Sequence, residues 1–151
     1  MCSSDLLAGH PLASDARDHG GAVKTIRIST QRREEMVDVT EQVRSLVAAA
    51  GLDAGVCLVF SPHTTCAVTV NEGWDPDVQA DALRHLSSLV PRDGGFAHAE
   101  GNSDSHIKTI AVGPSVLLPV DGGQLRLGRW QAVFLCEFDG PRQRELWVEV
   151  K

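Results

Sequence analysis

The chain lacks the features that mark several specialised classes of protein. No run of its 151 residues approaches the roughly 18 consecutive apolar residues of a membrane-spanning helix. The first twenty residues contain no charged segment followed by an apolar core, so we expect no secretory signal. The four cysteines occur singly rather than in CxxC pairs, which indicates small buried side chains and no disulfide framework. We therefore expect a soluble, cytoplasmic protein with no membrane partner.

Basic residues are scarce as well. The 14 lysines and arginines are outnumbered by 20 aspartates and glutamates, which gives a formal net charge of −6. No stripe of lysine or arginine with interleaved aromatic residues is present, which argues against nucleic acid as a partner. The pair Arg32-Arg33 is followed directly by Glu34-Glu35, and this alternation of charge predicts the solvent-exposed tip of a hairpin.

The length is typical of one domain. Residues 1–21 have little apolar periodicity, contain many small and polar residues and end in two glycines, so they predict a disordered N-terminal tail. We place a single domain at residues 22–151.

Apolar patterning predicts an α+β fold, a largely antiparallel sheet or sandwich with two helices. Residues 23–29 and 35–39 are two extended segments around a polar turn, which predicts a first hairpin. The continuous apolar run at 56–61 is typical of a central strand covered on both faces. Residues 107–112 are also expected to be extended, and about eight strands result in all.

Two segments have helical periodicity and recognisable ends. Apolar residues of the first helix follow Thr40, a plausible N-cap, and the helix is expected to stop at Gly51. The second helix should begin after Asp75, which can cap it, with Pro76 in the first turn. Because Asp75 has this structural task, Glu72 and Asp81 are the stronger candidates for a functional carboxylate in this region.

The segment Phe96–Lys108 carries two histidines, two carboxylates and an amide around one glycine. His98 and His106 would lie about 26 Å apart on a strand and about 12 Å apart along a helix. Only a turn brings the two imidazoles together. Gly101 and Asn102 tolerate the backbone conformations that such a turn needs, so we interpret this segment as a site loop.

Three histidines at strand ends or in turns, His63, His98 and His106, are the predicted metal ligands, because three imidazoles with one open position form a catalytic zinc pattern. Their spacing matches no short zinc motif, so ordinary loop histidines remain an alternative. The expected cofactor is a divalent metal ion, zinc first and magnesium second. Three carboxylates near these positions are candidates for acid–base catalysis, namely Glu72, Asp81 and Glu100. Polar and basic groups are candidates for binding an anion, and they are Gly101, Asn102, Lys108 and Arg142.

Several ordered motifs together resemble the YjbQ-type family over about Thr25 to Val150. They are Ser61-Pro62-His63-Thr64-Thr65, Asn71-Glu72 with Asp75-Pro76, His98 with Gly101-Asn102, Ser105-His106-Ile107-Lys108, Leu127-Gly128-Arg129-Trp130-Gln131 and Glu137-Phe138-Asp139-Gly140-Pro141-Arg142. The chain departs from the family pattern at Arg129, where a threonine is common, and at residues 103–105, which replace a more alanine-rich run.

The resemblance implies a β-rich α+β fold, a homotrimer and the activity of a secondary thiamine-phosphate synthase, which joins a pyrimidine pyrophosphate to a thiazole phosphate. In a trimer, Trp130 or Arg142 of a neighbouring copy would complete the ligand site. The histidines equally suit a metal-dependent hydrolase of a phosphorylated metabolite. A non-catalytic trimeric module that binds a small anionic metabolite is the third alternative.

Overall fold

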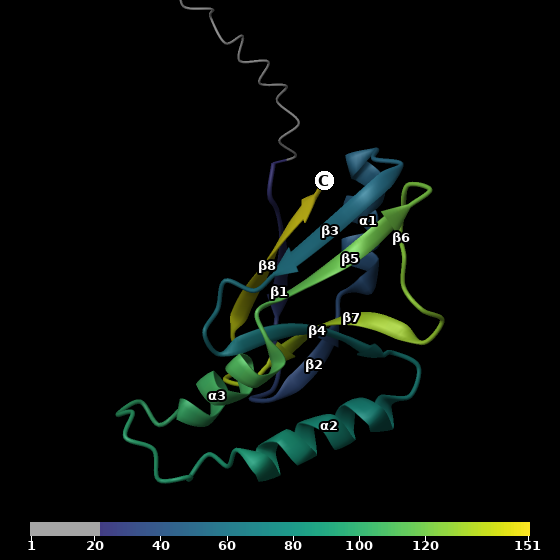
Figure 1. Ribbon diagram of the computed structural model, residues 1–151. Helices are drawn as coiled ribbons and strands as arrows, with labels where there is room; N and C mark the ends of the chain where they lie inside the picture. The colour runs from purple at the N-terminus through teal and green to yellow at the C-terminus, as the bar shows by residue number, and fades with distance from the viewer. Residues whose placement is uncertain (1–21) are drawn as a thin grey trace, which may run out of the picture.

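The computed structural model describes residues 22–151 (Figure 1), so the predicted tail lies outside the described residues. Within them, eight strands and three helices form a five-stranded and a three-stranded sheet, and every strand pair is antiparallel. The expected α+β class is confirmed. No helix in this part of the chain is long and apolar enough to cross a membrane.

The five-stranded sheet has its predicted central strand. Its order is β1 (Lys24–Ser29), β8 (Gln143–Val150), β3 (Ala54–Phe60), β5 (Ser115–Asp121) and β6 (Gln124–Leu125). The inward side chains of β3, Cys57 and Val59, are fully buried, whereas Val56 on the outer face is 42% exposed. The expectation that both faces of β3 are covered is therefore wrong for a single chain.

The three-stranded sheet has the order β2 (Glu35–Asp38), β7 (Gln131–Glu137) and β4 (Cys66–Glu72). Since β1 pairs with β8 and β2 pairs with β7, the predicted first hairpin is wrong. The chain crosses from one sheet to the other, and the backbone N–H of Thr30 donates to the carbonyl of Arg142 at the crossing. Two extended segments around a polar turn give the same sequence pattern in a hairpin and in such a crossing, and pairing with distant strands decides between them.

Apolar side chains pack on both faces of β7. Val133 and Leu135 join the core between the two sheets, which α1 (Thr40–Ala50) completes. Phe134 and Cys136 belong to a second cluster, against which Leu86 of α2 (Pro76–Leu89) and Val112 of α3 (Ser103–Val112) pack. Figure 1 shows both helices beside the three-stranded sheet. Burial on both faces explains the continuous apolar composition of this strand.

The two predicted helices are present, with one change at a cap. Asp75 accepts a hydrogen bond from the Asp77 N–H at 2.9 Å, as expected of an N-cap. Thr40 lies one residue inside α1, where its N–H and hydroxyl both donate to Asp38. Gly51 ends α1 in a left-handed conformation with φ of 65°.

Helix α3 corrects the prediction of an extended segment at 107–112. Its inward side chains are the polar Ser105, Lys108 and Thr109, whereas Ile110 is 81% exposed. This inverts the usual amphipathic pattern, so hydrophobic periodicity gave the wrong result. An Asp104–Lys108 ion pair, one helical turn apart, stabilises the helix instead.

Candidate functional site

The predicted turn brings His98 and His106 into contact. Gly101 has a φ of 71°, and its N–H donates to the His98 carbonyl at 3.2 Å. The two imidazole centroids lie 5.5 Å apart with ring planes at 80°. Glu100 places a carboxylate oxygen 3.6 Å from Nε2 of His98, whose side chain is 44% exposed. The turn thus collects two imidazoles and one carboxylate at a solvent-accessible point.

The separation of these rings suits a shared metal ion. Zinc lies about 2 Å from each ligand nitrogen, so two imidazoles on one tetrahedral ion have centroids about 5 Å apart. Within the described residues, the buried Oδ1 of Asn102, which lies between the two histidines in the sequence, has no hydrogen-bond partner. Within residues 22–151 of one chain, no group of three histidine, cysteine, aspartate or glutamate side chains is arranged to hold a metal. The pair therefore supplies two donors of the predicted three.

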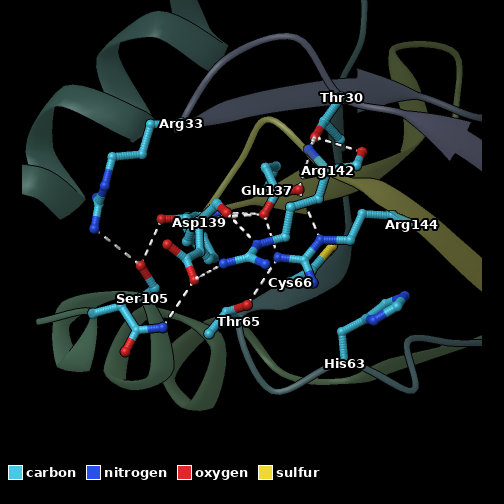
Figure 2. Close-up of polar contacts among 12 residues, drawn as sticks. Thr30, Arg33, His63, Thr65, Cys66, Ser105, Glu137, Asp139, Arg142 and Arg144 are labelled. Carbon is cyan, nitrogen blue, oxygen red and sulfur yellow. Dashed lines mark hydrogen bonds and ion pairs between the residues drawn. The ribbon is translucent and has the colours of Figure 1, made fainter. Parts of the chain in front are cut away.

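His63 is held in a separate environment. Its Nε2 accepts a hydrogen bond from the Glu145 backbone N–H at 3.0 Å on strand β8. Burial, followed by the nearby Arg144 guanidinium, lowers the pKa of His63, so the ring is neutral at neutral pH (Figure 2). In one chain His63 is thus not grouped with His98 and His106, and its role as a third ligand stays a prediction.

The first turn of α3 is fixed to the segment that follows β7. Asn102 Nδ2 donates to the Asp139 carboxylate at 2.8 Å, and the Ser105 hydroxyl donates to the Phe138 carbonyl at 2.6 Å. Arg142 donates to the same Asp139 oxygen as Asn102, at 3.0 Å, and its side chain remains 54% exposed. The guanidinium of Arg142 is therefore linked through one carboxylate to the turn that carries the histidine pair.

A buried ion pair supports this segment from inside. Arg144 donates to both carboxylate oxygens of Glu137, at 2.8 and 2.6 Å, and also to the Thr65 hydroxyl (Figure 2). Glu137 in turn accepts the backbone N–H groups of Phe138 and Asp139. Burial alone would raise the pKa of Glu137, but the bonds from Arg144 and the Asp139 N–H outweigh it and the pKa is lowered. Glu137 is thus an ionised buried carboxylate with its acceptor sites filled.

A second charged cluster adjoins Ser105 on α3, because Arg33 donates to the Ser105 hydroxyl at 3.3 Å. Arg33 binds Asp104 through two bonds of 3.1 Å, and Lys108 binds Asp104 at 3.0 Å and also contacts Glu34. The side chains of Arg33 and Glu34 are only 27% and 20% exposed. The predicted solvent-exposed hairpin tip is therefore wrong, because these charges meet partners 71 to 74 residues away.

Lys108, a predicted anion ligand, lies in this cluster. Its side chain is 1% exposed and its ammonium lies between two carboxylates. Burial would raise the pKa of Asp104, yet the hydrogen bonds from Arg33 and Lys108 lower it, so Asp104 remains ionised. Lys108 belongs to the framework beneath the histidine pair rather than to its accessible surface.

Three other candidate residues lie elsewhere. Glu72 is the last residue of β4 and pairs with Gln131, the first residue of β7, and Trp130 directly precedes β7. The other end of β7 is Glu137, which lies beside α3. Seven strand residues span about 20 Å, so Glu72 and Trp130 are remote from the histidine pair of their own chain. Asp81 is exposed on α2 and pairs with Arg84.

Apart from Lys108, which was predicted to bind an anion, sequence reasoning assigned no site role to the residues of the two buried ion clusters. Glu137 carried one usable signal, a carboxylate in the middle of an apolar run between Cys136 and Phe138. A charge in such a run is rarely buried unless it is paired, so it predicts a buried ion pair. Its partner could not be identified from spacing alone.

Comparison with known proteins identifies the relatives. Residues 24–151 match the family model described as UPF0047 protein YjbQ-like. The chain belongs to the YjbQ-like family. A UPF0047 protein of Methanocaldococcus jannaschii is 43% identical, covering 82% of this chain and 90% of the relative. The YugU protein of Bacillus subtilis is 40% identical, covering 85% and 98%.

Solved structures of this family have the same fold. An uncharacterised YjbQ/UPF0047 protein of Clostridium acetobutylicum superposes with a TM-score of 0.84 at 38% identity, covering 85% of this chain and 99% of that one. A protein of unknown function from Sulfolobus solfataricus gives 0.83 at 33% identity, covering 85% and 95%. The predicted family and fold are confirmed, and neither description names a reaction.

Proposed function

We propose that this YjbQ-like protein is a metal-associated enzyme that acts on a small phosphorylated metabolite. The observation that carries the proposal is the contact between His98 and His106, two imidazoles at a separation suited to one metal ion beside the Glu100 carboxylate. The reaction we favour joins a pyrimidine pyrophosphate to a thiazole phosphate, in the manner of the secondary thiamine-phosphate synthases. The ring nitrogen of the thiazole forms the new bond to carbon as pyrophosphate departs.

The residues around the pair have suitable roles. When bound to His98 and His106, zinc or magnesium would neutralise the charge of the leaving pyrophosphate. Arg142 is exposed and linked through Asp139 to the same turn, so it is placed to receive a phosphate oxygen. Glu100 is the carboxylate nearest the pair and the candidate acid or base.

Metal-dependent hydrolysis is the second candidate function. Imidazole ligands suit zinc, which activates water, better than magnesium, which prefers oxygen ligands. If the protein does not catalyse the coupling reaction, we propose hydrolysis of a phosphorylated metabolite instead. The two imidazoles of His98 and His106 beside the Glu100 carboxylate suit a zinc ion that activates water.

Assembly into a homotrimer is part of the proposal. The outer face of the five-stranded sheet carries Val56, Leu117 and Trp147, which are 42%, 65% and 41% exposed in the single chain. Exposed apolar side chains clustered on a sheet face are typical of subunit interfaces. A neighbouring copy would also be the source of the third metal ligand that one chain does not bring to the histidine pair within residues 22–151.

The test is turnover by the metal-loaded protein. The two thiamine precursors are supplied together and separately, with and without chelator, and thiamine phosphate, pyrophosphate and phosphate are followed. We expect chelator-sensitive coupling that is lost in His98→Ala and His106→Ala and kept in His85→Ala, an exposed histidine on α2. Phosphate release without coupling would select the hydrolase, and binding without turnover would select the non-catalytic module. Full coupling in both site variants would refute the assignment.

A further inference from the structure

A hollow lies at the end of β7 that is remote from α3. It has a volume of about 460 Å³ and opens between the first turn of α1 and the corner where β4 and β7 meet. Ligand pockets commonly measure roughly 300 to 1,000 Å³, so the space fits a small molecule. The residues of its wall that matter here are Thr40, Gly73, Trp74, Arg129, Trp130 and Gln131.

Two tryptophans form the apolar side of this pocket. Trp74 and Trp130 meet edge to face with centroids 6.0 Å apart, and they are 78% and 48% exposed. Indole rings are large apolar surfaces that proteins usually cover, so this degree of exposure at a hollow indicates a surface for stacking a ligand.

The backbone brings the two tryptophan residues together. Gly73 donates its N–H to the Trp130 carbonyl at 2.8 Å, which ties the segment before Trp74 to the segment before β7. A side chain at Gly73 would lie 2.5 Å from Cβ of Ala132, so only glycine permits this approach. The backbone segments that carry the two indoles are therefore held next to each other without a ligand.

The pocket wall carries two carboxylates, Asp38 and Glu41, and two guanidinium groups, Arg44 and Arg129. Arg129 lies with its guanidinium carbon 4.7 Å from the centre of the Trp130 ring, and within residues 22–151 it forms no ion pair. The acidic side chains of the wall are engaged locally. Glu41 pairs with Arg44 at 2.9 Å, and Asp38 accepts the N–H and hydroxyl of Thr40.

We propose that this pocket binds a flat heteroaromatic ring that carries a phosphate, as in a mononucleotide. The ring stacks against Trp74 and Trp130, and the phosphate is bound by Arg129 through charge-assisted hydrogen bonds. The site lies at the opposite end of β7 from His98 and His106 and requires no metal. It is therefore separate from the proposed catalytic site.

Calorimetric titration of the full chain with three compounds tests each part of the site. Adenosine monophosphate supplies ring and phosphate, adenosine supplies the ring, and ribose 5-phosphate supplies the phosphate. We expect adenosine monophosphate to bind at least about tenfold more tightly than either fragment, since stacking and charge pairing both contribute. Arg129→Gln should reduce its affinity to that of adenosine, and Trp74→Ala should weaken both ring-containing compounds about tenfold, with recovery in Trp74→Phe.

Two matched variants distinguish binding in this pocket from binding at the histidine pair and from general attraction of the phosphate to surface arginines. Arg92→Gln removes an exposed arginine outside the pocket, and His98→Ala alters the proposed metal site; both should bind adenosine monophosphate like the wild type. The proposal is overturned if adenosine monophosphate binds no better than ribose 5-phosphate, or if Arg129→Gln and Trp74→Ala leave its affinity unchanged. Loss of binding in His98→Ala would also overturn it, by assigning the ligand to the histidine site.

Discussion

The two ends of strand β7 differ in which side chains are buried and which are exposed. At the Glu137 end, buried charges are matched one against another, and Glu137 and Asp104 are wholly inaccessible to solvent. At the Gln131 end, large apolar rings are left in solvent around a hollow. The same strand thus ends in a fixed framework on one side and in an open surface on the other.

The difference indicates how the histidine pair is kept in position. The loop before α3 is exposed, but the helix itself is attached to Phe138 and Asp139 through Ser105 and Asn102. Glu137 fixes the backbone of that segment, and Asp104 fixes the first turn of α3 to Arg33. A buried ion framework is costly to form, yet it sets geometry precisely, which suits a site that must align two imidazoles.

Breaking the framework should have the largest effect on stability. Glu137→Ala leaves the buried Arg144 without its carboxylate, and we expect a loss of about 3 to 5 kcal/mol in the free energy of unfolding, measured in urea. The matched change Glu41→Ala removes an exposed carboxylate paired with Arg44 and should cost under about 1 kcal/mol. Similar losses in the two variants would show that the Glu137 end is not a special framework.

Removing one member of the Asp104 cluster should have an intermediate effect. Lys108→Met keeps the length of the side chain, and Asp104 retains both bonds from Arg33, so we expect a loss of about 1 to 3 kcal/mol. The variant should also weaken metal binding, because α3 carries His106. A stability equal to that of the wild type would contradict the role of Lys108 as a framework residue.

Removing the N-cap of α2 should have a smaller effect on stability and no effect on activity. Asp75→Ala removes the acceptor at the start of α2 and should cost about 1 kcal/mol with turnover unchanged. Glu72→Gln and Asp81→Asn test whether these carboxylates contribute to function, with thermal midpoint and turnover measured together. If Asp75→Asn abolished turnover at unchanged stability while the other two left it intact, the assigned roles would be reversed.

The pH dependence contributed by His63 should be the smallest effect. Its pKa is lowered in the folded chain, so the unfolded chain binds more protons as the pH falls below about 6.5. The protonation of His63 therefore leaves the free energy of unfolding unchanged above that pH and lowers it as the pH falls toward the lowered pKa. His63→Gln should show a shallower decline between about pH 7 and pH 5, and an equally steep one would indicate that other groups are responsible.

Local patterns predicted those elements whose apolar periodicity agrees with their packing. The helix that follows Asp75 and the helix that ends at Gly51 are examples, since each has the cap or stop that the sequence predicts. Helix α3 was missed because it turns polar residues inward. The crossing between β1 and β2 was mistaken for a hairpin because strand partners are chosen by distant residues.

The site was predictable only where its contacts are local. The turn at Gly101 followed from two histidines eight residues apart and from the freedom of glycine. The framework beneath it joins Arg33 to Asp104 and Thr30 to Glu137, pairs separated by 71 and 107 residues. No spacing rule applies at such separations, so the composition of β7 showed that Glu137 needed a partner but not which one.

The most direct test of the account is the metal content of the purified protein. Elemental analysis after dialysis against zinc would compare the wild type with His98→Ala, His106→Ala and His85→Ala. We predict that zinc stays with the wild type and His85→Ala and is lost from both site variants, because we propose that the adjacent His98 and His106 share one ion. Equal zinc content in all four proteins would contradict a metal site at the histidine pair.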